Sequence, residues 1–128
     1  IKGRNEVNKF WHGFYGKNVE ATIDLAAVKS ISNLSIGCLQ AYRDWIFLPT
    51  EVKFETSLDG INFTEIGTVS NNISVNEQAS TIKEFTLQFP KTMARYVRVK
   101  AIATGVCPKG HSGEGKASWT FVDELVVE

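Results

Sequence analysis

The stretch VEATIDL, residues 19–25, alternates strictly between apolar and polar side chains. Successive side chains of a β-strand point to opposite faces, so this stretch predicts a strand with one face on a core and the other in water. The same period of two recurs at residues 31–38, 52–55, 85–89 and 97–101. Residues 117–127 are apolar on both faces, which predicts a strand that is covered on both sides.

Turn signals separate these predicted strands. Leu58-Asp59-Gly60 lies between two of them, and an Asp-Gly pair suits a tight hairpin turn. Residues 71–79 are polar and predict a hairpin loop, and a single helical turn fits residues 26–30. No stretch shows the 3.6-residue spacing of a longer helix. The pattern predicts an all-β fold of about eight antiparallel strands, a β-sandwich or jelly roll.

The composition fits one globular domain, which we place at residues 1–128. Hydrophobic residues make up 43% and charged residues 22% of the 128-residue chain. Lys and Arg number 14, as do Asp and Glu, so the formal net charge is zero. This balance disfavours nucleic acid and an anionic membrane surface as partners, because both select basic proteins. The chain starts at Ile1 without a methionine, and we expect it to be a fragment of a longer polypeptide.

The two cysteines, Cys38 and Cys107, leave two states open. A disulfide between them would close a loop of about 70 residues and contribute roughly 4 kcal/mol in the loop-entropy treatment. Alternatively both remain thiols, because Cys38 is in phase with Leu34 and Ile36 and suits a buried core position.

The sequence contains no constellation that predicts catalysis. The two histidines have no partner at zinc-ligand spacing, and no nucleophile-elbow, phosphate-loop or dinucleotide motif is present. Asp123 and Glu124 form a carboxylate pair, as a glycosidase requires. Neighbours on a strand point to opposite faces, so these two cannot flank one bond. We therefore do not expect this domain to be an enzyme.

The connection at residues 39–49 is longer than a hairpin needs, and long connections on a rigid sandwich often carry binding sites. It holds the candidate ligand-binding residues Tyr42, Arg43 and Trp45. An aromatic face stacks on a sugar ring, and a guanidinium bonds hydroxyl groups in a fixed plane. Alternatively Trp45 covers the mouth of the core.

The second long connection, residues 104–118, is rich in Gly and Lys. Its candidate ligand-binding residues are Lys109, His111 and Glu114. A neutral histidine donates and accepts one hydrogen bond each, which suits a pair of sugar hydroxyls. The alternative is a loop histidine whose hydrogen bonds go to the backbone.

The remaining tryptophans are predicted to be core residues. Trp11 precedes the first full strand, and Trp119 alternates with Phe121 on the strand that is apolar on both faces.

Several segments together resemble the discoidin, or coagulation factor 5/8 type C, family, which includes family 32 of the carbohydrate-binding modules. They are Trp11–Gly13, Ile23–Leu25, Trp45–Pro49, Ser57–Phe63, Ala94–Val99 and Trp119–Leu125. The segment Cys107–His111 running into Trp119–Glu124 is similar to the C-terminal module of Bacteroides-type family 20 glycosidases, the β-hexosaminidases or chitobiases.

The resemblance implies a galactose-binding-like jelly roll. It also implies a non-catalytic module of a secreted bacterial glycoside hydrolase, in the periplasm or on the outer surface, that binds a terminal galactose or N-acetylhexosamine. Relatives hold a structural calcium ion, for which Asn5 and Glu124 are the nearest matches here. An alternative is a structural module that docks on its own catalytic domain and binds no free ligand. The phospholipid binding of clotting-factor relatives is disfavoured by the neutral charge.

Overall fold

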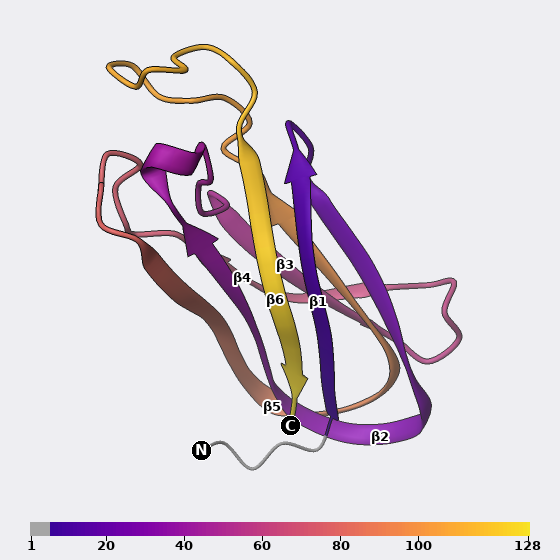
Figure 1. The fold of residues 1–128 in the computed structure, drawn as a ribbon. Coiled ribbons are helices and arrows are strands. Elements are labelled where there is room, and N and C mark those ends of the chain that lie inside the picture. The colour runs from indigo at the N-terminus through magenta and orange to yellow at the C-terminus, as the bar shows by residue number, and fades with distance from the viewer. Residues whose placement is uncertain (1–5) are drawn as a thin grey trace.

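The computed structural model describes the backbone of residues 6–128 and the side chains of residues 15–122 and 125–128. Over this range the elements are β1 (Glu6–Tyr15), β2 (Val19–Gln40), the 3-10 helix η1 (Tyr42–Asp44), β3 (Glu51–Ser57), β4 (Thr64–Ser70), β5 (Thr81–Ile102) and β6 (Trp119–Val127). The strands follow the order β1-β6-β2-β5-β3-β4 with antiparallel neighbours (Figure 1). This stretch forms no helix with the length and hydropathy that a membrane span requires.

Two long strands run through both layers of the sandwich. The first part of β2, Val19–Asp24, pairs with Tyr96–Ala101 of β5, and its last part, Asn33–Gln40, pairs with Thr81–Gln88. Strand β3 extends the former pairing and β6 the latter. Counting each half separately over the described residues gives four strands per layer. The predicted galactose-binding-like jelly-roll β-sandwich of about eight antiparallel strands is confirmed.

The bend in β2 is a bulge and not the helical turn that fits residues 26–30 in the sequence. The register with β5 shifts between Asp24 and Lys29, and Ala26 has a positive φ of 72°. Residues 25–28 of β2 lie opposite Arg95 alone, and such extra residues bend the bulged strand. The Asp24 carboxylate accepts a hydrogen bond from the Ala26 N–H at 2.8 Å, which stabilises this geometry. The bulge lets one strand serve both layers.

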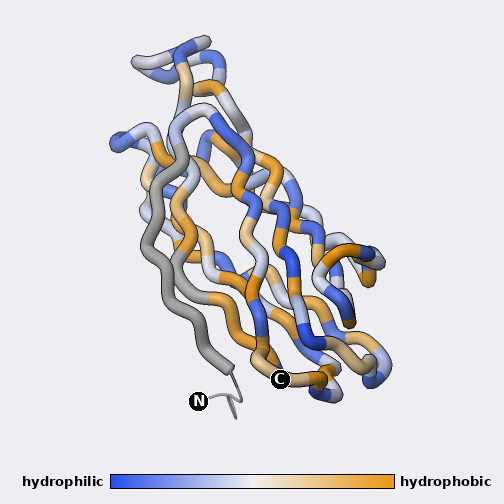
Figure 2. Tube along the Cα trace, turned by 90° about the vertical axis from the view of Figure 1, so that its right-hand side faces the viewer, coloured by the Kyte–Doolittle hydropathy of each residue, from blue (hydrophilic) through white to orange (hydrophobic). Residues whose placement is uncertain are grey.

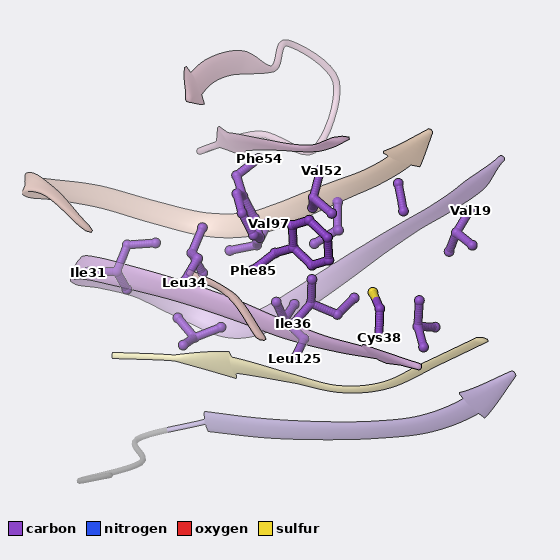
Figure 3. Packing of buried hydrophobic residues seen from close by; sticks show 14 of the residues in the cluster. Val19, Ile31, Leu34, Ile36, Cys38, Val52, Phe54, Phe85, Val97 and Leu125 are labelled. Atoms are coloured by element: carbon purple, nitrogen blue, oxygen red, sulfur yellow. The ribbon is translucent and has the colours of Figure 1, made fainter. Parts of the chain in front are cut away.

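The core lies between the two layers, as Figure 3 shows. Its largest side chains include Phe85, Leu34 and Ile36 from one layer and Phe54, Val52 and Val97 from the other, each 1% exposed or less. These are the apolar positions of the period-two stretches, so the alternation assigned the core face correctly. Burying each such side chain contributes roughly 1.5–3 kcal/mol.

Strand β6 lies between its neighbours β1 and β2. The prediction that both of its faces are covered is confirmed for its last residues. Leu125, Val126 and Val127 are consecutive and all buried, which requires protein on both faces.

Both cysteines are buried thiols, and no disulfide joins them. Cys38 is part of the core (Figure 3), whereas Cys107 lies in the connection between β5 and β6. Burial raises the pKa of the Cys107 thiol, because removal from water disfavours the thiolate. Of the two states left open by the sequence, the structure has the reduced one.

The β3–β4 hairpin turns at the predicted Asp-Gly pair. The Asp59 carboxylate accepts hydrogen bonds from the backbone N–H groups of Asn62 and Ile61 at 2.8 Å each and from the Ser57 hydroxyl at 2.9 Å. These donors hold the pKa of Asp59 well below its usual range. Gly60 supplies the positive φ, 78°, that the turn needs.

Candidate functional site

Three connections meet at one end of the sandwich, away from the C-terminus: residues 41–50, 71–80 and 103–118 (Figure 1). The tip of the last is largely hydrophilic in Figure 2. Backbone hydrogen bonds anchor the connections to one another and to β6. The Trp119 N–H donates to the Trp45 carbonyl at 2.7 Å, and the Asn71 N–H donates to the Thr50 carbonyl at 2.9 Å. We call this region the loop end.

A buried glutamine at the end of β2 ties two of these connections together. Gln40 is 0% exposed. Its Nε2 group donates to the backbone carbonyls of Ser74 at 2.9 Å and Glu77 at 3.1 Å, and its Oε1 atom accepts from the Leu48 N–H at 3.4 Å. Every one of these bonds goes to loop backbone, so Gln40 sets the shape of the loop end.

The aromatic residues of the first connection pack inward. Tyr42 lies on η1, and its ring makes edge-to-face contacts with the rings of Phe47 and His111 at centroid distances of 5.9 and 4.5 Å. Trp45 adopts a left-handed backbone conformation with φ 64° and is half-buried. A Cβ on Gly113 would lie 2.7 Å from the Trp45 ring, so the ring is seated on the other connection. This geometry matches the covering role left open for Trp45.

His111 is buried and bonded to backbone through both ring nitrogens. It is 5% exposed. Nδ1 lies 2.9 Å from the Gly113 nitrogen and Nε2 lies 2.6 Å from the Tyr42 carbonyl oxygen. This is the backbone-bonded histidine that the sequence left as the alternative, and in this arrangement neither nitrogen is available to a sugar hydroxyl.

The charged candidates, in contrast, face solvent. Arg43 on η1 and Lys109 and Glu114 on the longer connection are all exposed. One oxygen of Glu114 accepts a hydrogen bond from the Gly110 N–H at 2.7 Å, which fixes the carboxylate at the loop tip. The fold thus brings Tyr42, Arg43 and Trp45 to the same end as Lys109, His111 and Glu114.

The core prediction for Trp119 is wrong. The residue is 36% exposed, and its ring lies 5.0 Å from that of Tyr15, which is 48% exposed, and 5.9 Å from that of Phe121. Thr120 and Val122 face the interior, so the alternation turns Trp119 outward. Because both faces of this strand are apolar in sequence, periodicity alone did not identify the wetter face. The side chain of Trp11 lies outside the described residues.

The two predicted calcium ligands, Asn5 and Glu124, also lie outside the described side chains. Among the described residues no group of three or more His, Cys, Asp and Glu is placed to hold a metal ion. The calcium site stays a prediction.

A concavity lies elsewhere, between the β3–β4 hairpin and residues Thr92 and Met93 of β5. It encloses about 380 Å³, and its lining includes Ser57, Asp59 and Met93. Its best acceptor, the Asp59 carboxylate, is already occupied by the hairpin donors. We therefore place the candidate site at the loop end, because charged side chains and exposed rings both lie at this end of the sandwich.

Two solved structures with TM-scores above 0.5 agree with the fold. The module CpGH89CBM32-5 of Clostridium perfringens, in complex with GalNAc-β-1,3-galactose, is 23% identical with a TM-score of 0.51, and the match covers 84% of this chain and 63% of that chain. A chitosan-binding module from a chitosanase/glucanase of Paenibacillus sp. IK-5 is 14% identical with a TM-score of 0.55, covering 98% and 79%. The C-terminal domain of a Bacteroides fragilis chitobiase is 22% identical with a TM-score of 0.48, covering 88% and 63%.

The chain thus spans 63% of the length of the C. perfringens and B. fragilis chains. A comparison with curated proteins found no match. The family model named F5/8 type C domain matches residues 1–122, which is nearly the whole chain. This protein belongs to the F5/8 type C domain family.

Proposed function

We propose that this domain is a non-catalytic carbohydrate-binding module whose ligand site is the loop end. The observation that carries the proposal is the exposed ring pair of Tyr15 and Trp119, 5.0 Å apart, at the edge of the polar connections. Exposed aromatic pairs are unusual on a soluble surface, and the apolar face of a pyranose stacks on such a platform.

Charged side chains at the same end would bond the sugar hydroxyls. Arg43 and Lys109 offer donors only, whereas Glu114 offers an acceptor, so together they match both roles of a hydroxyl group. Tyr42 packs on His111 and Trp45 on Gly113, both in the other connection, and these contacts would hold the charged groups in place. In this proposal His111 supports the loops and does not contact the ligand.

The ligand class we propose is a terminal galactose or N-acetylhexosamine. The family resemblance supports this, as does the C. perfringens module of the same fold, which was solved with GalNAc-β-1,3-galactose. We further propose that the parent chain is a secreted bacterial glycoside hydrolase similar to a β-N-acetylhexosaminidase. The module would then hold that enzyme near its glycan, in the periplasm or on the outer surface.

A second candidate function is docking on the catalytic domain of the same chain. Leu58 and Ile61 of the β3–β4 hairpin and Met93 of β5 are 58%, 82% and 56% exposed and lie away from the loop end. Apolar side chains gathered in this way favour contact with another protein surface. A shortened enzyme that keeps its full stability and activity without the module would rule this function out.

Titration by NMR tests the carbohydrate proposal. Galactose, N-acetylgalactosamine and N-acetylglucosamine are added to the labelled domain up to tens of millimolar, because small hydrated ligands bind weakly. We expect shifts for residues of the loop end, and a loss of affinity of about tenfold or more in Trp119→Ala, which removes a stacking contact. Ile82→Ala, at a residue that is 65% exposed on β5, is the matched control and should bind normally.

Two results would contradict the proposal. One is the absence of any shift with all three sugars, with and without calcium. The other is sugar binding that Trp119→Ala and Tyr15→Ala leave unchanged, since the exposed rings would then not form the platform.

A further inference from the structure

We propose that the neutral His111 side chain, which we call the latch, holds the connections of residues 41–50 and 103–118 together by hydrogen bonds. Its protonation would open the latch and weaken ligand binding. The statement about ligand binding rests on the proposed function, whereas the latch itself does not.

The hydrogen bonds of the ring fix its protonation state. The backbone N–H of Gly113 can only donate, so Nδ1, 2.9 Å away, must be the unprotonated acceptor. The proton of the neutral ring is therefore on Nε2, which donates to the Tyr42 carbonyl at 2.6 Å. One imidazole thus joins segments that are 69 positions apart in the sequence.

Aromatic side chains surround the ring. His111 is 5% exposed and lies among the rings of Tyr42, Phe47 and Trp45, at centroid distances of 4.5, 5.5 and 5.9 Å. The titratable and charged groups of the two packed segments are Tyr42, Arg43 and Asp44 on η1 and Cys107, Lys109, Glu114 and Lys116 on the connection. No carboxylate among the described residues forms a hydrogen bond or ion pair with the ring.

Protonation would break the bond to Gly113. A hydrogen on Nδ1 would point at the Gly113 N–H, and two donors cannot share a hydrogen bond. The ring would have to turn or leave, and turning would also lose the bond from Nε2 to Tyr42. Trp45 rests on Gly113, so its ring would move with the latch.

Besides this ring packing, few hydrogen bonds among the described residues tie the tip of the longer connection to its surroundings. Its other described hydrogen bonds, such as those from Lys116 to Gly113 and from Gly115 to Cys107, lie within the connection itself. The Thr104 hydroxyl donates to the Leu48 carbonyl at 2.9 Å, but only at the base. Among the described residues, positions 108–116 are hydrogen-bonded to residues 41–49 through His111 alone. Opening the latch would therefore free the tip as a unit.

The latch sets the distance between charged groups of the proposed site. Arg43 is on one side of it, and Lys109 and Glu114 are on the other. The ring pair of Tyr15 and Trp119 lies on β1 and β6 and would stay in place. Acid should therefore weaken sugar binding without abolishing it.

The latch is tested first without any sugar. Long-range proton–nitrogen NMR spectra of the labelled domain report the tautomer of His111, and amide exchange reports the Gly113 N–H, from pH 8 to pH 4. We expect the tautomer with the proton on Nε2 at neutral pH. We also expect Gly113 to lose protection, and Trp45 fluorescence to change, over the same pH range in which His111 gains its proton.

His111→Gln is the variant that separates the latch from general acid effects. A glutamine amide can still donate to the Tyr42 carbonyl but does not titrate, so this variant should keep its loop closed on acidification. The other histidine provides the control, and His12→Gln should respond to acid as the unchanged domain does. Sugar affinity should fall at least about fivefold with acid in the unchanged domain and much less in His111→Gln.

Three results would overturn the proposal of the latch. They are a neutral ring with its proton on Nδ1, protonation of His111 that leaves the Gly113 N–H protected, and a loop that opens in acid as much in His111→Gln as in the unchanged domain. Failure to bind any sugar would overturn the proposed function and the acid sensitivity of binding, while the tautomer and exchange data would still decide the latch.

Discussion

Replacing Gln40 by leucine should destabilise the domain far more than a surface substitution does. The residue is 0% exposed and makes its described hydrogen bonds only to the backbone of the loop end. Leucine has nearly the same size, so little cavity forms, and the effect reports the lost hydrogen bonds.

The magnitude follows from what each partner can do afterwards. The Leu48 N–H is buried and would have no acceptor, which costs about 1–3 kcal/mol. Ser74 and Glu77 are exposed, so their carbonyls regain water and each lost bond costs only about 0.5–1 kcal/mol. We therefore expect Gln40→Leu to lower the free energy of unfolding by about 2–5 kcal/mol.

Urea unfolding measures this change, and amide exchange over residues 71–80 locates it. Gln88→Leu is the matched control, since Gln88 is exposed on β5 and its loss should alter stability by less than about 0.5 kcal/mol. If Gln40→Leu were as mild as Gln88→Leu, the hydrogen bonds of Gln40 would not hold the loop end.

Gln40→Glu sharpens the test, because it keeps the shape and changes only the donor. An ionised carboxylate would face two carbonyl oxygens with no hydrogen to donate. This variant should be less stable than Gln40→Leu at pH 7 and should recover partly on acidification, when the carboxyl group gains a proton. Equal stability of the two variants at every pH would contradict this account.

Three further predictions concern other parts of the domain. Gly113→Ala would place a Cβ 2.7 Å from the Trp45 ring, so it should lower the free energy of unfolding by about 1–3 kcal/mol in a urea titration, and an unchanged midpoint would refute the close packing. Arg98 donates a hydrogen bond to the Glu55 carboxylate and thereby lowers the pKa of Glu55. The pair therefore stabilises the fold above the ordinary carboxyl pKa, and this stabilisation is lost as pH falls through the lowered pKa. Glu55→Gln should lower the free energy of unfolding by about 1 kcal/mol at pH 7, and this difference from the unchanged domain must shrink in acid. Calcium at a hundredfold excess over its Kd should stabilise the domain by about 2.7 kcal/mol, which thermal unfolding measures. The predicted site would be ruled out if calcium left the melting temperature unchanged, or if Asn5→Ala and Glu124→Gln did not alter the effect of calcium.

Much of the fold was predictable because the geometry of a strand imposes a pattern on residues that are close in the sequence. A period of two follows directly from side chains that alternate between faces, so Leu34, Ile36 and Phe85 were assignable to the core from sequence. The turn at Asp59 and Gly60 was equally local, since it depends on one positive φ and on neighbouring donors. The two connections of the candidate site were found by their length and composition.

The sequence by itself therefore determined the class of fold, the core faces and the segments that form the loop end. Only the tertiary structure decided which apolar face of β6 is exposed to solvent and carries Trp119. It also decided which backbone groups His111 binds. It also decided that β2 and β5 each serve two layers. The physical reason is distance along the chain: periodicity records how neighbours orient, whereas contacts such as His111 to Tyr42, 69 positions apart, exist only once the strands have brought the connections together.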